Sequence, residues 1–357
     1  MSRFLVVLAD APVSRVDRGE TLLKFLRRFE PATRALHTAE LAAGPRVPCD
    51  VAFVGMPSAV TPEALDRLRA GRVVAFDYFD EPWPNTEAPG LAASDALGRL
   101  APLHLKTHRE RVPPRWAATS TTGGPRIGLL PIRYNGAVAA AWRRYRWSAP
   151  WRRLRRLGGR HGRPWDVSLH GSVTLLERQA PDGSLVRYDQ RVEWMRELRA
   201  HPEWRSWGGL LELPYRTREA IIADHGPEAA AWFDPGPRLP FGTYFARMAD
   251  TRVALCPAGH ARWTYRHVES VYAECEIVST DLNGVDTLVP APLDAMTLVP
   301  DHAPITPAVD AALAGWADRA ARRDGAVEFL QGWLEGGKFS RRKRRPFEAF
   351  VRQLELP

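Results

Sequence analysis

Arg266 and Glu269 are the two residues of this chain whose types and spacing best suit chemistry on a phosphate ligand. Residues three apart on a helix share one face, and these two lie near the start of a helix expected at 265–273. An arginine there can hold a diphosphate, and a glutamate can accept hydrogen bonds from ribose hydroxyls. The spacing therefore predicts a phosphate site, and an ordinary Arg–Glu surface pair is the alternative that it leaves open.

The elements around this pair must place it at the edge of a sheet. Residues 251–281 read TRVALCPAGHARWTYRHVESVYAECEIVSTD, which predicts a buried strand, a loop, a helix and a second strand. In an open parallel sheet the ligand crevice lies beyond the carboxyl ends of the strands, where the N–H groups of a helix start bind phosphate. The loop and the helix start supply the further candidates Pro257, Gly259, His260, Arg262 and Thr264.

The same stretch resembles the C-terminal half of the exostosin-like glycosyltransferases. That family has a strand ending in Cys-Pro, a glycine loop, a Ser-any-Arg-any-any-Glu helix start and a small-Gly-Cys-Ile-Pro-Val strand. Here the positions read LCPAGH, TYRHVE from Thr264 to Glu269, and AECEIV. The departures are Glu274 in place of glycine and Glu276-Ile277 in place of Ile-Pro, which would alter how the following loop approaches a donor.

The resemblance extends from about residue 165 to 285. Upstream, PWDVSLHGS resembles the family's strand that ends in a glycine loop at Gly171, and Arg191 in the next helix is a further candidate for the diphosphate. His170, directly before this glycine, could donate to a phosphate or a sugar hydroxyl, and a structural role is equally open.

The resemblance implies an α/β protein of the GT-B fold, in which two Rossmann-like domains face each other across a cleft. The C-terminal domain would hold a nucleotide-diphosphate sugar as co-substrate, and the N-terminal domain the acceptor. The family usually needs no metal, and we expect neither a metal nor a cofactor here. The donor-binding residues that we expect are Gly171, Arg191, Pro257, Gly259, His260, Arg262, Thr264, Arg266 and Glu269.

A transfer that inverts the sugar's anomeric centre needs a general base near the acceptor hydroxyl. A strand expected at 73–77 ends in Asp77, and Asp80 follows in the next loop. Asp80 is our first candidate for the base and Asp77 the second. His108, at the end of another expected strand, could itself serve as the base. Each carboxylate could instead cap an element or pair with an arginine, and the histidine could be a polar loop residue.

The chain is long enough for two domains, since 357 residues with 45% hydrophobic composition can bury two cores. Apolar runs alternate with helical patterns in both halves, which indicates parallel α/β sheets. The elements that we expect include helices at 20–29, 64–69, 93–100 and 308–322 and strands at 210–213 and 253–256. We expect an N-terminal domain at 1–160, a C-terminal domain at 161–335 and a basic tail with a helix at 336–357. Between them, 143–163 is rich in Arg, Trp and Gly, which suits either a membrane or acidic-acceptor surface or a solvated linker.

The net charge of +9 is carried almost entirely by arginine, because the only lysines are Lys24, Lys106, Lys338 and Lys343. Guanidinium suits phosphate, although codon bias in a GC-rich genome explains the same excess. The run Arg341–Arg345 would suit peripheral contact with an anionic membrane, or is a solvated helix end. No RNA-binding motif accompanies the charge, so we expect no nucleic-acid partner.

The opening residues, MSRFLVVLADAP, do not have the pattern of a secretion signal, and no apolar run approaches the ~18 residues of a membrane span. The three cysteines have no metal-ligand spacing and are expected to be reduced. A cytoplasmic location is therefore expected.

The function that we expect is a metal-independent, inverting glycosyltransferase that acts on a glycan, a lipid-linked or a small-molecule acceptor. Two alternatives stay open. One is a non-catalytic nucleotide- or polyanion-binding protein of the same architecture, and the other is sugar–phosphate transfer or epimerisation on the same fold.

Overall fold

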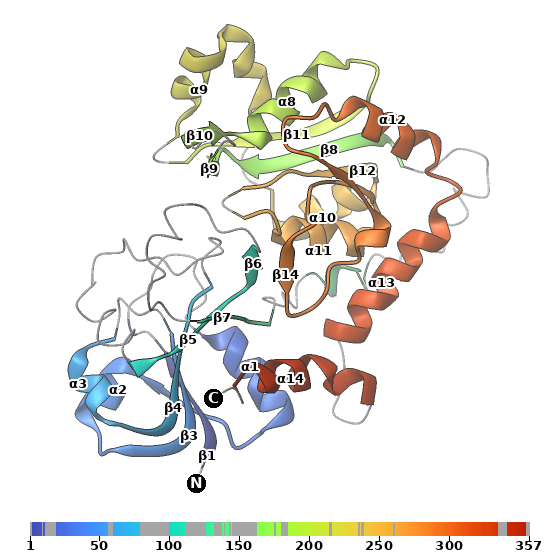
Figure 1. The fold of residues 1–357 in the computed structure, drawn as a ribbon. Helices are drawn as coiled ribbons and strands as arrows, with labels where there is room; N and C mark the ends of the chain where they lie inside the picture. The colour runs from blue at the N-terminus through green and yellow to red at the C-terminus, as the bar shows by residue number, and fades with distance from the viewer. Residues whose placement is uncertain are drawn as a thin grey trace. The chain divides into compact units, whose positions relative to one another are not determined.

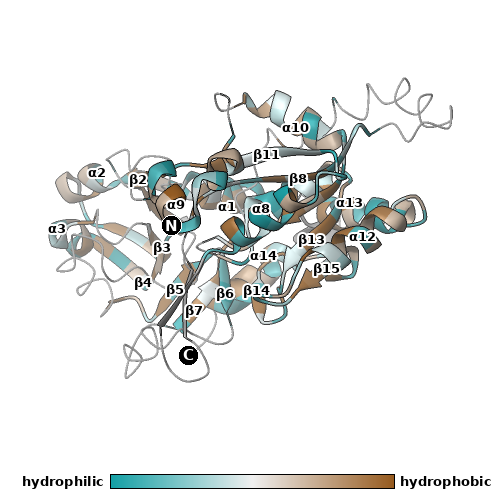
Figure 2. Cartoon of the chain, turned by 90° about the horizontal axis from the view of Figure 1, so that it is seen from above, coloured by the Kyte–Doolittle hydropathy of each residue, from teal (hydrophilic) through white to brown (hydrophobic). Residues whose placement is uncertain are grey.

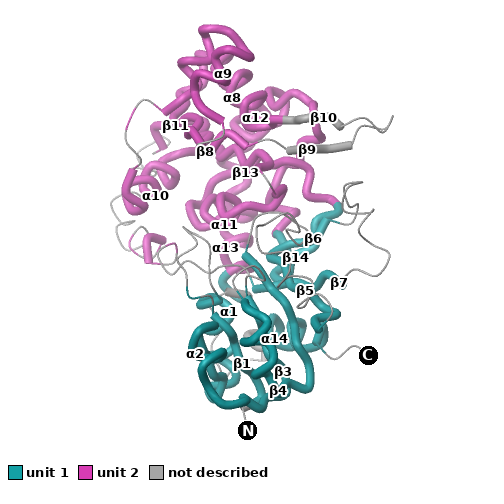
Figure 3. The backbone as a smooth tube through the Cα atoms, turned by 90° about the vertical axis from the view of Figure 1, so that its left-hand side faces the viewer, with its two compact units in different colours: residues 1–134, 284–291, 331–357 teal, residues 135–283, 292–330 magenta. Residues whose placement is uncertain are grey.

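The fold is taken from a computed structural model of residues 1–357. It describes residues 2–8, 10, 19–55, 60–78, 100–110, 126–131, 138, 140–142, 144, 163–174, 176–179, 185–213, 216–234, 236, 239–259, 261–334 and 341–354. The chain divides into two compact units, coloured separately in Figure 3. Unit 1 comprises 1–134, 284–291 and 331–357, and unit 2 comprises 135–283 and 292–330.

Unit 1 is built on a six-stranded parallel sheet with the strand order β2-β1-β3-β4-β5-β7 (Figure 1). Its strands are β1 (Ser2–Leu8), β2 (Arg34–His37), β3 (Val47–Gly55), β4 (Leu68–Phe76), β5 (Leu103–Lys106) and β7 (Arg126–Leu129). A separate antiparallel pair joins β6 (His108–Glu110) to β14 (Val285–Thr287). The helices are α1 (Glu20–Phe29), α2 (Thr38–Ala43), α3 (Pro62–Asp66) and α14 (Arg341–Leu354).

Side chains alternate in direction along the strands of unit 1, so each face of the sheet has its own hydrophobic core. In β1, Phe4 and Val6 pack with side chains of α1 and with Phe347 and Phe350 of α14, while Leu5 packs with side chains of α2 and α3 on the other face. Successive side chains of a strand point to opposite faces, so this pattern is the direct result of an apolar run buried on both sides. The segment expected to be a tail at 336–357 thus contributes α14 to the core of unit 1.

Unit 2 is built on a five-stranded parallel sheet with the order β11-β8-β12-β13-β15. Its strands are β8 (Trp165–Ser172), β11 (Ser206–Leu211), β12 (Thr251–Cys256), β13 (Glu276–Thr280) and β15 (Met296–Val299), and β9 (Leu176–Gln179) pairs with β10 (Leu185–Tyr188) in an antiparallel hairpin. The α-helices are α8 (Gln190–Ala200), α9 (Arg218–His225), α10 (Phe241–Ala249), α11 (Tyr265–Tyr272), α12 (Thr306–Ala314) and α13 (Ala320–Leu334). Two short 3-10 helices are η2 (Pro227–Trp232) and η3 (Leu293–Ala295).

In Figure 2 the strands of both sheets contain brown segments, which are their apolar runs, as expected for parallel strands covered on both faces. In unit 2 the core joins Val167 and Leu169 of β8 to Trp194 and Met195 of α8. Two parallel sheets with helices confirm the α/β class expected from the sequence. Among the described helices, none combines the length and the apolar character needed to cross a membrane.

Because the five strands of unit 2 are parallel, their last residues share one edge of the sheet, which we call the carboxyl edge, and their first residues share the amino edge. Ser172 and Cys256 end β8 and β12 at the carboxyl edge, and Glu276 begins β13 at the amino edge. Most of the donor-binding candidates lie at the carboxyl edge.

Candidate functional site

The segment 251–281 folds as the strand–loop–helix–strand unit that its sequence predicts. β12 ends at Cys256, a loop follows, α11 begins at Tyr265, and β13 pairs in parallel with β12. Pro257 and Gly259 are buried in the loop. His260 lies outside the described residues, so its place in the site stays a prediction.

Three of the candidates meet at the loop, although they come from separate parts of the chain. A methyl group placed on Gly259 would lie 2.1 Å from Nη2 of Arg191, and one on Gly171 would lie 3.1 Å from Cδ of the same side chain. Nη1 of Arg191 donates a hydrogen bond of 2.6 Å to the backbone oxygen of Ser172. The Arg191 side chain therefore runs across both glycines, and the absence of a Cβ makes room for it.

The first turn of α8 also shapes this loop. Gln190, which is 1% exposed, accepts a hydrogen bond of 2.7 Å at Oε1 from the N–H of Ala258. Nε2 of Gln190 and Oγ1 of Thr174, which is 5% exposed, have no hydrogen-bond partner among the described residues. The sequence does not single out either residue. The loop thus has two buried polar atoms beside Arg191 that are available to a ligand or to water.

Thr264 begins α11 and is held by the side chain of His267. The N–H of Thr264 donates to Nδ1 of His267 over 3.1 Å, so the proton of the neutral ring is on Nε2, which lies 2.8 Å from Oγ of Ser279. Burial is the largest cause that lowers the pKa of His267, to about 3, which keeps the ring neutral. His267 therefore ties the helix start to β13.

Arg266 also lies at the start of α11, and its side chain makes no hydrogen bond or ion pair with the residues that the structure describes. It is half-buried, and its charge influences the titration of His170 and Tyr244. The hydroxyl of Tyr244 donates a hydrogen bond of 3.0 Å to Oε2 of Glu269, one helical turn beyond Arg266. The predicted Arg266–Glu269 pair is thus brought together with two aromatic side chains.

The surroundings of these residues are electropositive. Burial, followed by the charges of Arg266, Arg247 and Arg199, lowers the pKa of His170 to about 3. His170 is 9% exposed, and its Nε2 has no partner among the described residues, while Nδ1 lies 3.8 Å from Asp234. A neutral histidine can offer a hydrogen bond without adding charge, and Arg266, at the start of α11, favours an anion at this edge.

Arg262 is placed differently from Arg266. Its Nη2 lies 2.6 Å from Oδ2 of Asp301, and its Nη1 donates to the backbone oxygen of Asp281 over 2.7 Å. These contacts join the loop before α11 to the segments that follow β13 and β15. A role of Arg262 in donor binding would require this guanidinium to serve a ligand in addition to Asp301.

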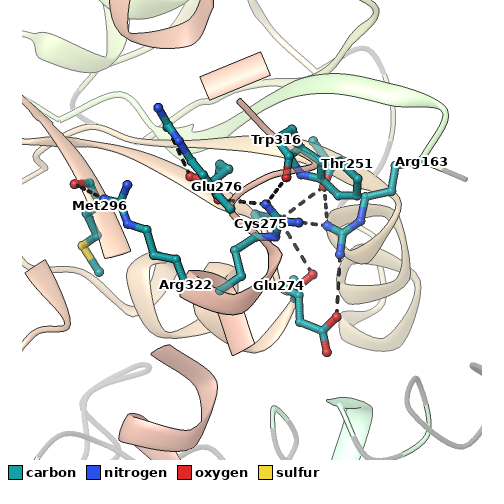
Figure 4. Close-up of polar contacts among 11 residues, drawn as sticks. Arg163, Thr251, Glu274, Cys275, Glu276, Met296, Trp316 and Arg322 are labelled. Carbon is teal, nitrogen blue, oxygen red and sulfur yellow. Dashed lines mark hydrogen bonds and ion pairs between the residues drawn. The ribbon is translucent and has the colours of Figure 1, made fainter. Parts of the chain in front are cut away.

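The positions that depart from the family pattern, Glu274 and Glu276, lie at the amino edge (Figure 4). Glu276 is 2% exposed, and its Oε1 accepts a hydrogen bond of 2.8 Å from Arg323 of α13. Glu274 adopts a left-handed backbone, with φ of 57°, and its Oε2 lies 3.9 Å from Nη2 of Arg163. Both carboxylates therefore take part in a charge cluster at the opposite end of the strands from the donor candidates.

In unit 1, Asp77 follows the end of β4 and is paired with two side chains of β5. Its carboxylate bonds Nζ of Lys106 and lies 2.7 Å from Nε2 of His104, and all three residues are at most 5% exposed. Burial alone would raise the pKa of Asp77, but Lys106 and His104 outweigh it and lower the pKa to about 2. Asp77 is therefore ionised but only weakly basic.

The other two candidates for the base are Asp80 and His108, of which the structure describes only His108. Asp80 lies outside the described residues. His108 begins β6, is 1% exposed, and has its pKa lowered to about 3 by burial and then by the charge of Lys106. The described part of the chain holds no group of three or more His, Cys, Asp or Glu side chains that could bind a metal ion.

No protein-family model and no curated protein sequence matches this chain. Solved structures do. A trehalose-phosphate synthase (UDP-forming) from Burkholderia vietnamiensis superposes with a TM-score of 0.53 at 14% identity over 99% of this chain and 98% of the other. The E. coli protein titled trehalose-6-phosphate, bound with UDP-2-fluoro glucose, gives 0.53 at 11% identity over the whole of both chains. The N-terminal domain of a Candida albicans trehalose-6-phosphate phosphatase gives 0.54 at 11% identity, over 100% of this chain and 97% of the other.

The chain has the GT-B fold. Its two parallel α/β units are the two Rossmann-like halves of that fold, which confirms the fold expected from the sequence. At identities of 11% to 14% the likeness concerns the backbone alone. The resemblance to the exostosin-like family in particular stays a prediction, which depends on the residues from Thr264 to Glu269.

Proposed function

We propose that this GT-B protein is a glycosyltransferase that takes a sugar from a nucleotide-diphosphate sugar and passes it to a hydroxyl acceptor. The observation that supports the proposal is that Arg266 is partly buried and that its side chain is unpaired among the described residues. This residue is half-buried at the start of α11, at the carboxyl edge of unit 2, and no described side chain or backbone oxygen pairs with its guanidinium. Partly removing a charge from water without a partner is costly, and a bound diphosphate would offset that cost.

Different residues bind the diphosphate and the ribose of the donor. Arg266 and Arg191 contact the diphosphate, whose negative charge grows as the sugar leaves, so these contacts strengthen in the transition state. The loop at Gly259 lets the backbone approach the phosphates, and Glu269 accepts hydrogen bonds from the ribose hydroxyls. UDP is the first nucleotide to test, because one of the similar structures is a UDP-forming synthase and another is bound with UDP-2-fluoro glucose.

The stereochemistry depends on whether a base serves the acceptor. Asp77, with its pKa lowered to about 2, and His108, with its pKa lowered to about 3, are both weak bases, so the expectation of inversion depends on Asp80. One similar structure, with a TM-score of 0.51, is of a trehalose-6-phosphate synthase, an enzyme of glycosyltransfer with retention. The anomeric configuration of the first product, measured by proton NMR, decides between inversion and retention.

The acceptor is proposed only by class, as a glycan, a lipid-linked molecule or a small molecule with a free hydroxyl. We keep the expectation of a cytoplasmic protein that needs no metal, and the basic run Arg341–Arg345 is the surface proposed for contact with an anionic membrane. Sedimentation with vesicles of phosphatidylcholine and phosphatidylserine tests that contact, because binding should depend on the serine lipid and weaken with salt.

The decisive experiment measures nucleotide binding and turnover in the same preparation. Isothermal titration with UDP, GDP and ADP identifies the nucleotide, and release of the diphosphate from the matching sugar donor measures the chemistry. Arg266→Ala should weaken binding of the diphosphate roughly 10- to 100-fold, because a hydrogen bond to a charged group contributes about 1.5–3 kcal/mol. Thermal stability should change little, since Arg266 has no partner among the described residues to lose.

Arg205→Ala is the matched control. Arg205 is also an arginine of unit 2, but it pairs with Asp166 at the amino edge, so its removal should leave nucleotide affinity unchanged. Equal affinities in wild type and Arg266→Ala would overturn the role of Arg266. Binding of a nucleotide without turnover of any donor would favour a non-catalytic binding protein, and epimerised or phosphorylated sugar products would favour the other GT-B activities.

A further inference from the structure

Tyr244 is a residue near the carboxyl edge that the sequence gives no reason to select. It lies on α10, 25 residues before Glu269, and the two meet only because α10 and α11 pack against each other. α10 is followed directly by β12, so its first turn lies at the carboxyl edge and its end at the amino edge. This direction brings Tyr244 to the donor candidates.

The contact itself has a defined donor and acceptor. The phenol hydroxyl lies 3.0 Å from Oε2 of Glu269, and a carboxylate can only accept. Burial, and then the charge of Glu269, raises the pKa of Tyr244 well above its usual value. The hydroxyl therefore keeps its proton at every working pH and always donates.

The ring of Tyr244 is fixed by its neighbours. Its centroid lies 5.5 Å from that of His170 at an interplanar angle of 86°, 6.2 Å from that of Trp207, and 6.1 Å from that of Phe241. Edge-to-face packing of this kind restrains a ring from two or more sides. The hydroxyl is consequently held in place before any ligand binds.

We propose that Tyr244 is a positioning residue that fixes the carboxylate of Glu269 in the orientation that recognises the ribose diol of the donor. The inference rests on the proposed function, in which Glu269 contacts the ribose. A glutamate on a helix has three side-chain torsions, and losing their freedom on binding weakens the complex. The bond from Tyr244 removes part of that freedom in advance.

Comparison of nucleotides with and without a ribose hydroxyl tests this proposal. Wild-type protein should bind UDP more tightly than 2′-deoxy- or 3′-deoxy-UDP, by about tenfold for the hydroxyl that Glu269 contacts. Tyr244→Phe keeps the ring and removes the hydroxyl. It should weaken UDP binding about fivefold and leave the affinity for that deoxy nucleotide within about twofold of wild type, so that the discrimination ratio falls. If another base is preferred in the nucleotide titrations, the corresponding diphosphates replace UDP.

Tyr272→Phe is the matched control, because Tyr272 is a fully buried tyrosine near the end of α11, toward the amino edge. It should leave the discrimination ratio at the wild-type value even if it lowers the melting temperature. An unchanged ratio in Tyr244→Phe, with wild-type protein that binds UDP and discriminates, would overturn the positioning role alone. Absence of nucleoside diphosphate binding in wild-type protein would instead overturn the proposed function.

Discussion

Replacing Gly259 by alanine should act on the donor site through Arg191 and not through the backbone. The new Cβ would lie 2.1 Å from Nη2 and 2.7 Å from Cζ of Arg191, and 3.2 Å from Oγ1 of Thr174. These closest atoms belong to the far end of a flexible side chain, which can move. We therefore expect the loop to keep its fold while the guanidinium leaves its place and loses the 2.6 Å hydrogen bond to the oxygen of Ser172.

The size of the effect follows from that single displacement. A hydrogen bond from a charged donor contributes about 1.5–3 kcal/mol when buried, and Arg191 is only half-buried, so the free energy of unfolding should fall by about 1 kcal/mol. If the guanidinium also contacts the diphosphate, nucleotide affinity should fall roughly 10- to 100-fold. Arg191→Ala should cause a similar loss of affinity, and adding Gly259→Ala to it should cost little more, because both changes remove the same contact.

Two assays are needed, urea denaturation for stability and calorimetric titration with the preferred nucleoside diphosphate for affinity. Gly209→Ala serves as the comparison, because its Cβ would lie 2.3 Å from the backbone nitrogen of Asp234 and cannot be accommodated by a side-chain movement. That variant should lose about 3 kcal/mol of stability. Wild-type affinity in Gly259→Ala, or affinity losses of Gly259→Ala and Arg191→Ala that add in the double variant, would refute the reasoning.

Two further predictions concern stability. Glu274→Gly should be about 1 kcal/mol more stable than Glu274→Ala in urea denaturation, because both lose the carboxylate but only glycine is unstrained at the observed φ of 57°; equal midpoints would contradict this. Burial is the largest cause that lowers the pKa of His108, His170 and His267, each to about 3, so below pH 6.5 the unfolded chain takes up protons that the folded chain does not. Stability should be full above pH 6.5 and fall as the pH drops from 6.5 toward 3, by about 1.4 kcal/mol per pH unit for each histidine; a flat midpoint between pH 7 and 5, or an unchanged slope in His267→Gln, would contradict it.

Local patterns predicted the elements that have strong signals of their own. The helix α1 begins and ends where its apolar spacing places it, at Glu20 and Phe29, and β12 contains the whole of the predicted strand 253–256. Where pairing with a neighbour extends an element, the sequence pattern was misleading. Residues 67–69 were expected to end a helix, but α3 ends at Asp66 and β4 begins at Leu68, because Leu68 pairs with Val47 of β3.

Two further differences between the expected and the observed elements lie at glycines. The strand β11 was expected at 210–213 and lies at Ser206–Leu211, since Gly208 and Gly209 suggest a loop although both are in the strand. The helix expected at 308–322 is divided into α12, which ends at Ala314, and α13, which begins at Ala320. Gly315 follows the end of α12, and a glycine is common at this position of a helix. The helix expected at 93–100 lies almost entirely outside the described residues.

The site was predictable only where its residues are neighbours in the chain. Arg266 and Glu269 were found by their spacing, but the tyrosine that binds Glu269 is 25 residues away and has no motif around it. Arg191, Gly259 and Arg262 were each named as candidates from the sequence, but two contacts were not predicted. These are the contact of Arg191 with Gly259 and that of Arg262 with Asp301, between residues 68 and 39 apart in the chain. Such contacts are set by the order of strands in the sheet, which a single sequence does not reveal.

The charged residues of unit 2 serve different purposes at the two edges of the sheet. At the amino edge Glu276 is fully engaged by Arg323, with Arg319 at 3.6 Å, and no ligand is needed to balance it. At the carboxyl edge Arg266 has no such partner among the described residues. The strand β13 has five residues, so the two edges are about 13 Å apart at ~3.3 Å per residue. Glu274 and Glu276 therefore depart from the exostosin-like pattern in a region that supports α13, and the choice of donor has to be sought among the side chains around Arg266.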